Sequence, residues 1–223
     1  MSENKIDSND DSTQAIALQS NAPPNPTRRK LTGAGLGMSA IFTLASRPVL
    51  AAQCTSASAA ASGNLSQHGT PIVCTGRSPG YWKQPQHAKE WVAPYIQGSC
   101  SNGAGKGSMG CMESPEKWTG GTLFHDVFGG SNFKVNNKSL SMNQVMIMNN
   151  SSYAGLSDQD NCGCHIVAAL LNAASGKTNG VLSVMDVIGM WNEWVAKGYF
   201  EPSAGAKWNS AQIVAYLKTT MTA

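Results

Sequence analysis

The chain has 223 residues, of which 41% are hydrophobic and 13% charged, and its formal net charge is +3 at pH 7. This length accommodates one ordinary domain with extensions. After the leader described below, 11 basic and 9 acidic residues remain. Such a weak positive field argues against a nucleic-acid-binding or anionic-lipid-binding protein.

The first 51 residues have the features of an export leader. Residues 1–27 are polar and cannot bury enough apolar surface to order themselves, so we expect them to be disordered. Residues 28–51 begin with Arg28 and Arg29, continue through a weakly apolar run and end in small residues. A basic start, a short apolar centre and a small-residue cleavage site are typical of a secretory signal. The paired arginines favour the twin-arginine class.

We therefore expect cleavage after Ala51 or Ala52 and a periplasmic or extracellular mature protein. The segment Leu31-Thr32-Gly33 departs from the usual twin-arginine pattern, so the general secretory route stays open as the alternative. The apolar run over 31–46 is shorter than the roughly 20 residues that a spanning helix needs. We expect no membrane span in the mature chain.

All six cysteines follow the predicted cleavage site, and an even number in an exported chain predicts disulfide bonds. They are Cys54, Cys74, Cys100, Cys111, Cys162 and Cys164. A bond between Cys162 and Cys164, two residues apart, would be strained, so each is expected to hold a different distant segment. The smallest loop closure joins Cys100 to Cys111. Cys54 and Cys74 would then pair with Cys162 and Cys164, and a Cys54–Cys74 bond is the alternative.

The N-terminal half of the mature chain is expected to be rich in loops. Residues 52–80 predict an irregular arm with a short strand at 71–74. The segment 78–81 predicts a type II turn, in which Pro79 presets the second position and Gly80 supplies a positive φ at the third. A short helix is expected over 85–93, and four interior glycines make 98–111 a loop.

The second half predicts four helices. Ser141 with Gln144 forms a capping box for a helix through Met148. The next, from 161 or 162 to 174, is apolar almost all round and is therefore expected to be central. A second capping box begins a helix at Ser183, which ends at Gly198, and the last helix begins at 209 or 210. The predicted inner face of the 183–198 helix comprises Val184, Val187, Ile188, Trp191, Trp194 and Val195, and that of the last helix comprises Ile213, Val214, Tyr216 and Leu217.

The expected fold class is therefore mostly α, a small helical domain with a loop-rich, disulfide-tied N-terminal half. The helical domain covers 81–223 and forms one globular unit with the arm. Residues 75–83 read Thr-Gly-Arg-Ser-Pro-Gly-Tyr-Trp-Lys and residues 165–173 read His-Ile-Val-Ala-Ala-Leu-Leu-Asn-Ala. With these two segments, the chain resembles a group of uncharacterised secreted bacterial proteins over residues 74 to 195. The resemblance implies no known chemistry.

The chain has the features of an exported, disulfide-bonded protein, and no residues stand at the spacing of a known catalytic motif. Together these observations predict a structural or interaction module whose partner is a protein or a polysaccharide, with no cofactor. Loops carry recognition more often than core helices do, so the candidate recognition residues are Tyr81, Trp82 and Lys83, directly after the predicted turn. The chain has neither a G-x-S-x-G elbow nor an H-E-x-x-H helix, the motifs that would indicate a serine hydrolase or a zinc protease.

Two alternatives involve chemistry. Cys162, Cys164 and His165, with Met142 and Met146 one helical turn apart, could bind a soft metal such as copper or zinc. Against this, methionines on a helix usually fill core and the two cysteine pairs of a zinc site are missing. The other alternative is a hydrolase around His125 and Asp126, although adjacent residues on a helix do not normally face each other.

Overall fold

The computed structural model describes residues 54–63, 72–101, 108–148 and 152–222. The predicted disordered leader and the predicted signal lie outside these residues. Regular structure consists of helices and short strands. The α-helices are α1 (Ala57–Ser62), α2 (Pro79–Trp82), α3 (Phe124–Phe128), α4 (Met142–Met148), α5 (Cys162–Ala174), α6 (Val184–Lys197) and α7 (Ser210–Thr219). The described residues also contain the 3₁₀ segments η2 (Pro85–Glu90), η3 (Ser108–Cys111), η4 (Pro115–Lys117) and η5 (Gln159–Asn161).

The strands pair two by two. Adjacent antiparallel pairs are β4 (Lys134–Val135) with β5 (Lys138–Ser139) and β6 (Phe200–Ser203) with β7 (Ala206–Trp208). β2 (Ser99–Cys100) pairs antiparallel with β3 (Trp118–Thr119), and β1 (Gly76–Arg77) pairs parallel with β8 (Met221–Thr222). The β1–β8 pair therefore joins two segments that are far apart in the sequence.

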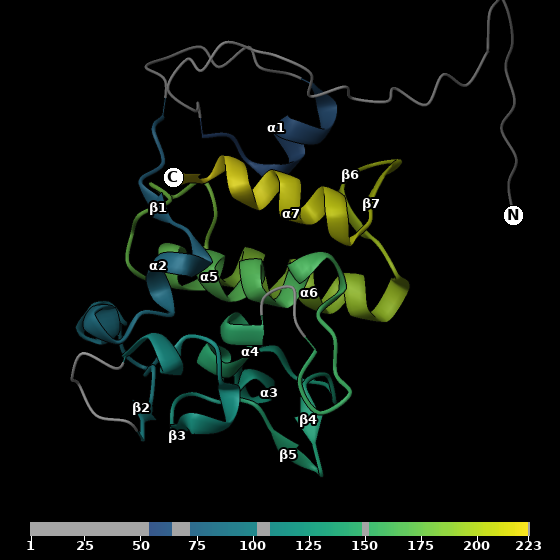
Figure 1. The fold of residues 1–223 in the computed structure, drawn as a ribbon. Coiled ribbons are helices and arrows are strands. Elements are labelled where there is room, and N and C mark those ends of the chain that lie inside the picture. Colours follow the sequence, from purple (N-terminus) through teal and green to yellow (C-terminus); the bar gives the residue numbers. More distant parts are fainter. Residues whose placement is uncertain (1–53, 64–71, 102–107, 149–151, 223) are drawn as a thin grey trace, which may run out of the picture. The chain divides into compact units, whose positions relative to one another are not determined.

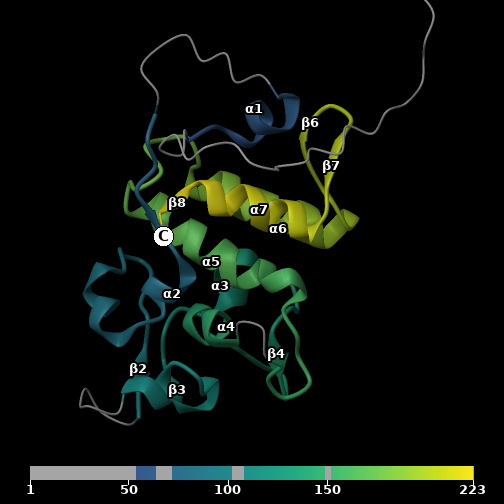
Figure 2. The same cartoon turned by 45° about the horizontal axis from the view of Figure 1, so that its top comes forward.

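Helix α5 is the centre of the core, as its apolar sequence predicts. Every residue from Cys162 to Asn172 is buried. Helices α4, α6 and α7 contact it directly, and α2 and β1 cover its C-terminal part. In both views α7 lies on one side of α5, whereas α4 lies on the other (Figures 1 and 2). A helix packed on both sides needs apolar residues around its whole circumference.

Four predicted helices are confirmed, and three of them begin with a capping box. Ser141 and Gln144 exchange the hydrogen bonds of a capping box before α4, and the box of Ser183 with Asp186 begins α6. Asn209 and Gln212 form a third box before α7. The predicted inner face of α7 is buried throughout, at Ile213, Val214, Tyr216 and Leu217.

Elsewhere the structure differs from the sequence predictions. The arm is not wholly irregular, because it contains α1. The short strand predicted at 71–74 is reduced to a single β-bridge residue, Val73, and the nearby strand β1 lies at Gly76–Arg77. The helix predicted over 85–93 is the shorter 3₁₀ segment η2. Residues 98–111 include β2 and η3 rather than loop alone.

The predicted type II turn at 78–81 is also wrong. Pro79 is the first residue of α2, and the Trp82 N–H donates to the Ser78 carbonyl at 3.3 Å, as in a helical turn. Gly80 is absent from the residues with positive φ. The fixed φ of proline suits both a type II turn and the first position of a helix, so the Pro-Gly pair alone does not separate them.

Alanine at Gly80 distinguishes these two conformations. A Cβ built there meets its nearest atom, Ser78 Oγ, at 3.6 Å, an ordinary contact. We expect Gly80→Ala to leave the free energy of unfolding unchanged or raise it by up to about 1 kcal/mol, because glycine loses more backbone entropy on folding. The matched variant is Gly76→Ala, whose Cβ would lie 2.3 Å from the Thr220 carbonyl oxygen. Urea unfolding should show a clear loss in the free energy of unfolding for Gly76→Ala and none for Gly80→Ala. A comparable loss for Gly80→Ala would support the type II turn.

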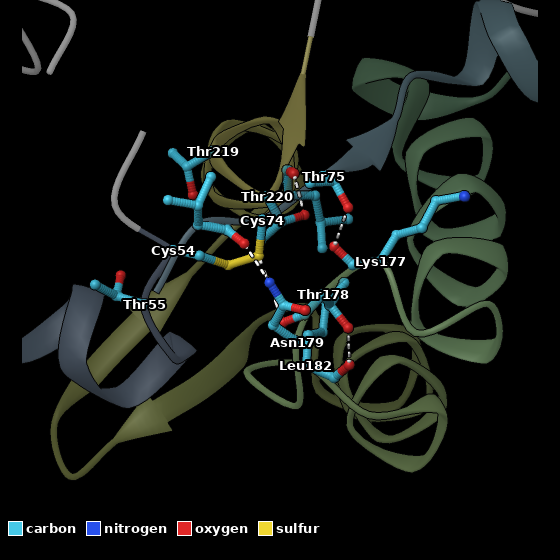
Figure 3. Close-up of a disulfide and its surroundings, with 12 residues drawn as sticks. Cys54, Thr55, Cys74, Thr75, Lys177, Thr178, Asn179, Leu182, Thr219 and Thr220 are labelled. Carbon is cyan, nitrogen blue, oxygen red and sulfur yellow. Dashed lines mark hydrogen bonds between the residues drawn. A yellow bond between two sulfur atoms is a disulfide. The ribbon is translucent and has the colours of Figure 1, made fainter. Parts of the chain in front are cut away.

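Two disulfide bonds stabilise the N-terminal half. Cys54 is bonded to Cys74 and Cys100 to Cys111. The Cys54–Cys74 bond lies where the arm meets the loop between α5 and α6 (Figure 3). There the Thr75 N–H donates to the Lys177 carbonyl at 2.9 Å, and the Asn179 side chain donates to the Val73 carbonyl.

Candidate functional site

Trp82, a predicted recognition residue, is a core residue. Its side chain is 0% exposed, so its prediction as a surface residue is wrong. The indole N–H donates to Oδ1 of Asn172 on α5 at 3.0 Å. The same amide accepts from the Arg77 N–H at 2.7 Å and donates to the Arg77 carbonyl at 2.9 Å. The two segments that mark the resemblance therefore meet in the core, where Asn172 links them.

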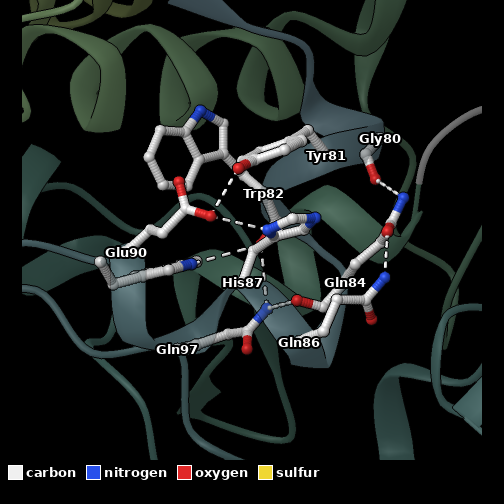
Figure 4. Close-up of polar contacts among 9 residues, drawn as sticks. Gly80, Tyr81, Trp82, Gln84, Gln86, His87, Glu90 and Gln97 are labelled. Carbon is white, nitrogen blue, oxygen red and sulfur yellow. Dashed lines mark hydrogen bonds and ion pairs between the residues drawn. The ribbon is translucent and has the colours of Figure 1, made fainter.

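Tyr81, the neighbouring candidate, is half-buried and contacts other parts of its own chain (Figure 4). Its hydroxyl donates to Glu90 Oε1 at 2.5 Å, and its ring stacks on the His87 imidazole with centroids 3.6 Å apart. The Arg77 guanidinium lies 5.0 Å from the Tyr81 ring centroid. Hydrogen bonds from Tyr81 and His87 lower the pKa of Glu90. Recognition through Tyr81 and the half-buried Lys83 stays a prediction.

Cys162 and Cys164 are free thiols, so the prediction that all six cysteines form disulfides is wrong. The leading connectivity, from Cys54 and Cys74 to this pair, is wrong as well, and the alternative Cys54–Cys74 bond is the one formed. Both thiols are buried in the first turn of α5. Burial raises the pKa of Cys164 to about 12 and that of Cys162 further. Since the thiolate is the reactive form, both cysteines are expected to be chemically inert in the folded protein.

The residues of the metal alternative lie in or against the core. Met142 and Met146 are both 0% exposed. The Cys164 thiol donates to the Met146 carbonyl at 3.6 Å, and His165 Nδ1 lies 2.8 Å from the Asn161 carbonyl oxygen. In the described ranges, no three His, Cys, Asp or Glu side chains lie together in a way that could hold a metal ion.

The N-terminus of α5 is capped by a carboxylate that sequence analysis did not single out. Asp158 accepts the N–H groups of Gly163 and Cys164 on its two oxygens, each at 2.8 Å. These bonds satisfy two of the free donors at the helix start and place negative charge at the positive end of the helix dipole. Burial nevertheless raises the pKa of Asp158 to about 6.

This raised pKa predicts a pH-dependent contribution to stability. The folded protein binds the Asp158 proton more tightly than the unfolded chain does, so the free energy of unfolding falls as pH rises through the window from about 4 to about 6. Asp158→Asn cannot ionise at this position and is the reference. Relative to it, the free energy of unfolding of the wild type should fall by about 2 kcal/mol across that window, after allowance for partial solvent screening. Urea unfolding of both proteins from about pH 4 to about pH 7 measures the difference. A constant difference would contradict the raised pKa.

The proposed hydrolytic pair makes a contact that its spacing did not predict. His125 Nε2 lies 3.0 Å from Asp126 Oδ1, although the residues are adjacent in α3. Both side chains are partly exposed, at 34% and 57%. The His125 Nδ1 atom is buried with no hydrogen-bond partner in the described part of the chain. Neither residue lines either of the two hollows described next.

The first hollow, of about 380 Å³, lies among α1, the start of α6 and β6. Its lining is mainly apolar and includes Met185, which is 73% exposed. Two carboxylates border it, and each is already bonded on its own helix. Asp186 accepts from the Ser183 hydroxyl at 2.7 Å, and Glu193 accepts from Lys197 at 3.0 Å.

The second hollow, of about 270 Å³, lies where the end of α6 meets the start of α7. It is lined by Asn132, Gln159, Trp194, Val195, Gly198, Asn209 and Ser210. One indole, three amide side chains and one hydroxyl therefore converge here, and no charged residue lines the hollow in the part of the chain that the structure describes. Pockets that bind small molecules commonly combine aromatic surface with a few polar groups that fix orientation.

Sequence analysis placed Trp194 in the core, and this is only partly right. Its ring centroid is 5.1 Å from that of the buried Trp191, yet Trp194 is half-buried and lines the second hollow. Val195, predicted on the same inner face, is 42% exposed. Both residues lie close to Gly198, where α6 ends. Helical periodicity gives the direction of a side chain but not whether a neighbouring element extends far enough to cover it.

Within the described residues, no helix is both long enough and apolar enough to cross a bilayer. The chain was also compared with protein-family models, with curated proteins and with solved structures, and none of the three comparisons found a match.

Proposed function

We propose that the chain is an exported, disulfide-braced interaction module that acts at the cell envelope or outside the cell. The observation that carries this proposal is the pair of disulfides, Cys54–Cys74 and Cys100–Cys111. Disulfides persist in oxidising compartments and are rare in the cytosol. Cys54 is the second or third residue after the predicted cleavage site, so processing would leave it in the mature protein.

The burial of the remaining thiols supports the same location. Cys162 and Cys164 are inaccessible and strongly disfavour the thiolate. Because disulfide exchange requires a thiolate that can reach its target, these two cysteines do not compete with the bonded pairs. A chain with this arrangement tolerates an oxidising compartment without mispairing.

The lining of the second hollow favours binding over acid–base chemistry. General acid–base catalysis needs a side chain that titrates near the working pH, whereas this lining consists of an indole, amides, a hydroxyl and small apolar groups. Amides both donate and accept hydrogen bonds without changing charge. The hollow is therefore suited to holding a polar partner rather than to transforming one.

Cell fractionation of the full chain in an exporting bacterial host tests the proposal. We expect processed protein outside the cytosol, with two disulfides and two thiols that react with a thiol reagent only after denaturation. Arg28→Lys combined with Arg29→Lys should retain the precursor in the cytosol, and Arg47→Lys is the matched control. Continued export of the double variant would indicate the general route. Wild-type chain found intact and fully reduced in the cytosol would contradict the proposal.

A further inference from the structure

We propose that the Trp194 hollow, lined by Asn132, Gln159, Trp194, Val195, Gly198, Asn209 and Ser210, binds a sugar ring of an uncharged polysaccharide. The inference rests on the proposed role as an interaction module and names the ligand class of that module. The hollow is slightly smaller than the range of about 300–1,000 Å³ that small-molecule sites span. This volume and its position at the surface suit one ring of a longer chain better than a whole enclosed ligand.

The aromatic surface is held by the packing of α6. Trp194 contacts the buried Trp191 with ring centroids 5.1 Å apart and a tilt of 54°. Trp191 in turn contacts Phe124 and Phe133, at 5.1 and 5.9 Å between centroids. The indole that lines the hollow is therefore an extension of the aromatic core. A rigid aromatic side chain presents a large apolar face at a low entropy cost, and the C–H face of a sugar ring is the complementary surface.

The polar side of the hollow carries unused hydrogen-bonding capacity. Within the described residues, the side chains of Asn132 and Gln159 have no hydrogen-bond partner. The Oδ1 atom of Asn209 caps α7 by accepting from the Gln212 N–H at 3.0 Å, which leaves its amide N–H₂ group as a donor. Neighbouring hydroxyls of a sugar need both donors and acceptors, and amide groups supply both.

The charge around the hollow favours a neutral ligand. Among the described residues the lining has no charged side chain, and the Asp160 carboxylate contacts it by accepting from the Ser210 hydroxyl at 2.5 Å. An anionic sugar would be repelled by that carboxylate and would find no cation in the lining. The Asp160 carboxylate, which would face a cationic ligand, is exposed and already accepts one hydrogen bond. Uncharged hydroxyl groups match both the amides and the carboxylate.

The test is isothermal titration of the exported, processed protein with cellohexaose, maltohexaose and chitohexaose, and with hexagalacturonate as the acidic counterpart. We expect at least one neutral oligosaccharide to bind and hexagalacturonate not to bind. Trp194→Ala should weaken binding about tenfold or more, because aromatic stacking on a ring ligand contributes at that scale. Trp194→Tyr should retain most of the affinity.

The polar contribution has a matched control. Gln159→Ala should weaken binding severalfold, whereas Gln86→Ala should not, although both glutamines are exposed and lie in 3₁₀ segments. The variants are compared only where thermal unfolding shows an intact fold. If no neutral oligosaccharide binds at millimolar concentration, or if neither Trp194→Ala nor Gln159→Ala weakens binding, the site is wrong. In that case, correct export with both disulfides would still support the interaction module, whereas retention in the cytosol would reject the module itself.

Discussion

Trp82→Ala is expected to lower the free energy of unfolding by about 4 kcal/mol, the largest single loss that we predict in this chain. The indole is fully buried, and its removal leaves a cavity between α2 and the central helix α5. The substitution also removes the N–H donor that Asn172 Oδ1 accepts at 3.0 Å. Because whole domains are stable by only about 5–15 kcal/mol, the variant should be substantially destabilised. Urea unfolding followed by far-UV circular dichroism measures the loss.

Two further variants separate the packing of Trp82 from its hydrogen bond. Trp82→Phe keeps most of the apolar volume and should cost less than Trp82→Ala. Asn172→Ala leaves the Trp82 and Arg77 N–H groups and the Arg77 carbonyl without this partner, at about 1–3 kcal/mol for each group that stays buried. In a double-mutant cycle of Trp82→Phe and Asn172→Ala, the losses in free energy of unfolding should be clearly non-additive. Tyr81→Phe is the control, because it changes a neighbouring side chain that is only half-buried. A loss below about 1 kcal/mol for Trp82→Ala would contradict its placement in the core.

Removal of the Cys54–Cys74 disulfide is expected to cost about 3 kcal/mol, the second large effect. The cysteines are 20 residues apart in the sequence, and closing a loop of that size restricts the unfolded chain by about this amount. Cys54→Ser with Cys74→Ser, compared with the wild type by urea unfolding, measures the loss. The control pair, Cys100→Ser with Cys111→Ser, closes the shorter loop of 11 residues and should cost slightly less.

The two disulfides also differ in the contacts that they support. Beside Cys54, the Thr55 carbonyl accepts the Tyr216 hydroxyl of α7 at 3.1 Å, and Cys54 N–H donates to the Ile72 carbonyl at 2.8 Å. We therefore expect loss of the first bond to expose the arm and α1 to proteolysis, and loss of the second to leave that region protected. Equal stability of the Cys54/Cys74 variant and the wild type would contradict the bond.

The helices could be predicted because their signals are local. The boxes at Ser141, Ser183 and Asn209 each use two side chains within one turn, and the apolar run of α5 is readable without knowledge of its neighbours. Contacts between distant segments gave no such signal. The parallel β1–β8 pair joins Gly76 to Met221, and nothing in either dipeptide specifies the other.

The errors at the cysteines and at Trp82 have one physical origin. Local geometry correctly excluded a bond between Cys162 and Cys164, but the even number of cysteines suggested that each had a partner. Only tertiary structure shows that both thiols lie in the buried first turn of α5. In the same way, the position of Trp82 directly after the predicted turn over 78–81 indicated a surface residue. The acceptor that holds its indole N–H is 90 residues away, on Asn172.

The candidate hollow combines what could and could not be predicted. The helix that carries Trp194 and a helix start at 209 or 210 follow from sequence, and Trp194 was among the aromatic residues predicted for the first of these helices. Asn132 and Gln159 carried no signal, because isolated amides in loops are common and their convergence depends on the fold. Exposure of the Trp194 indole depends on how far neighbouring elements extend, which sequence periodicity does not report.

Mass spectrometry of the protein recovered outside the cytosol, alkylated before reduction and then digested, tests the central claim most directly. We predict an N-terminus just after Ala51 or Ala52, linked peptides for Cys54–Cys74 and Cys100–Cys111, and alkylated thiols at Cys162 and Cys164. Six free cysteines in a chain that still begins at Met1 and stays in the cytosol would contradict both the location and the role inferred here.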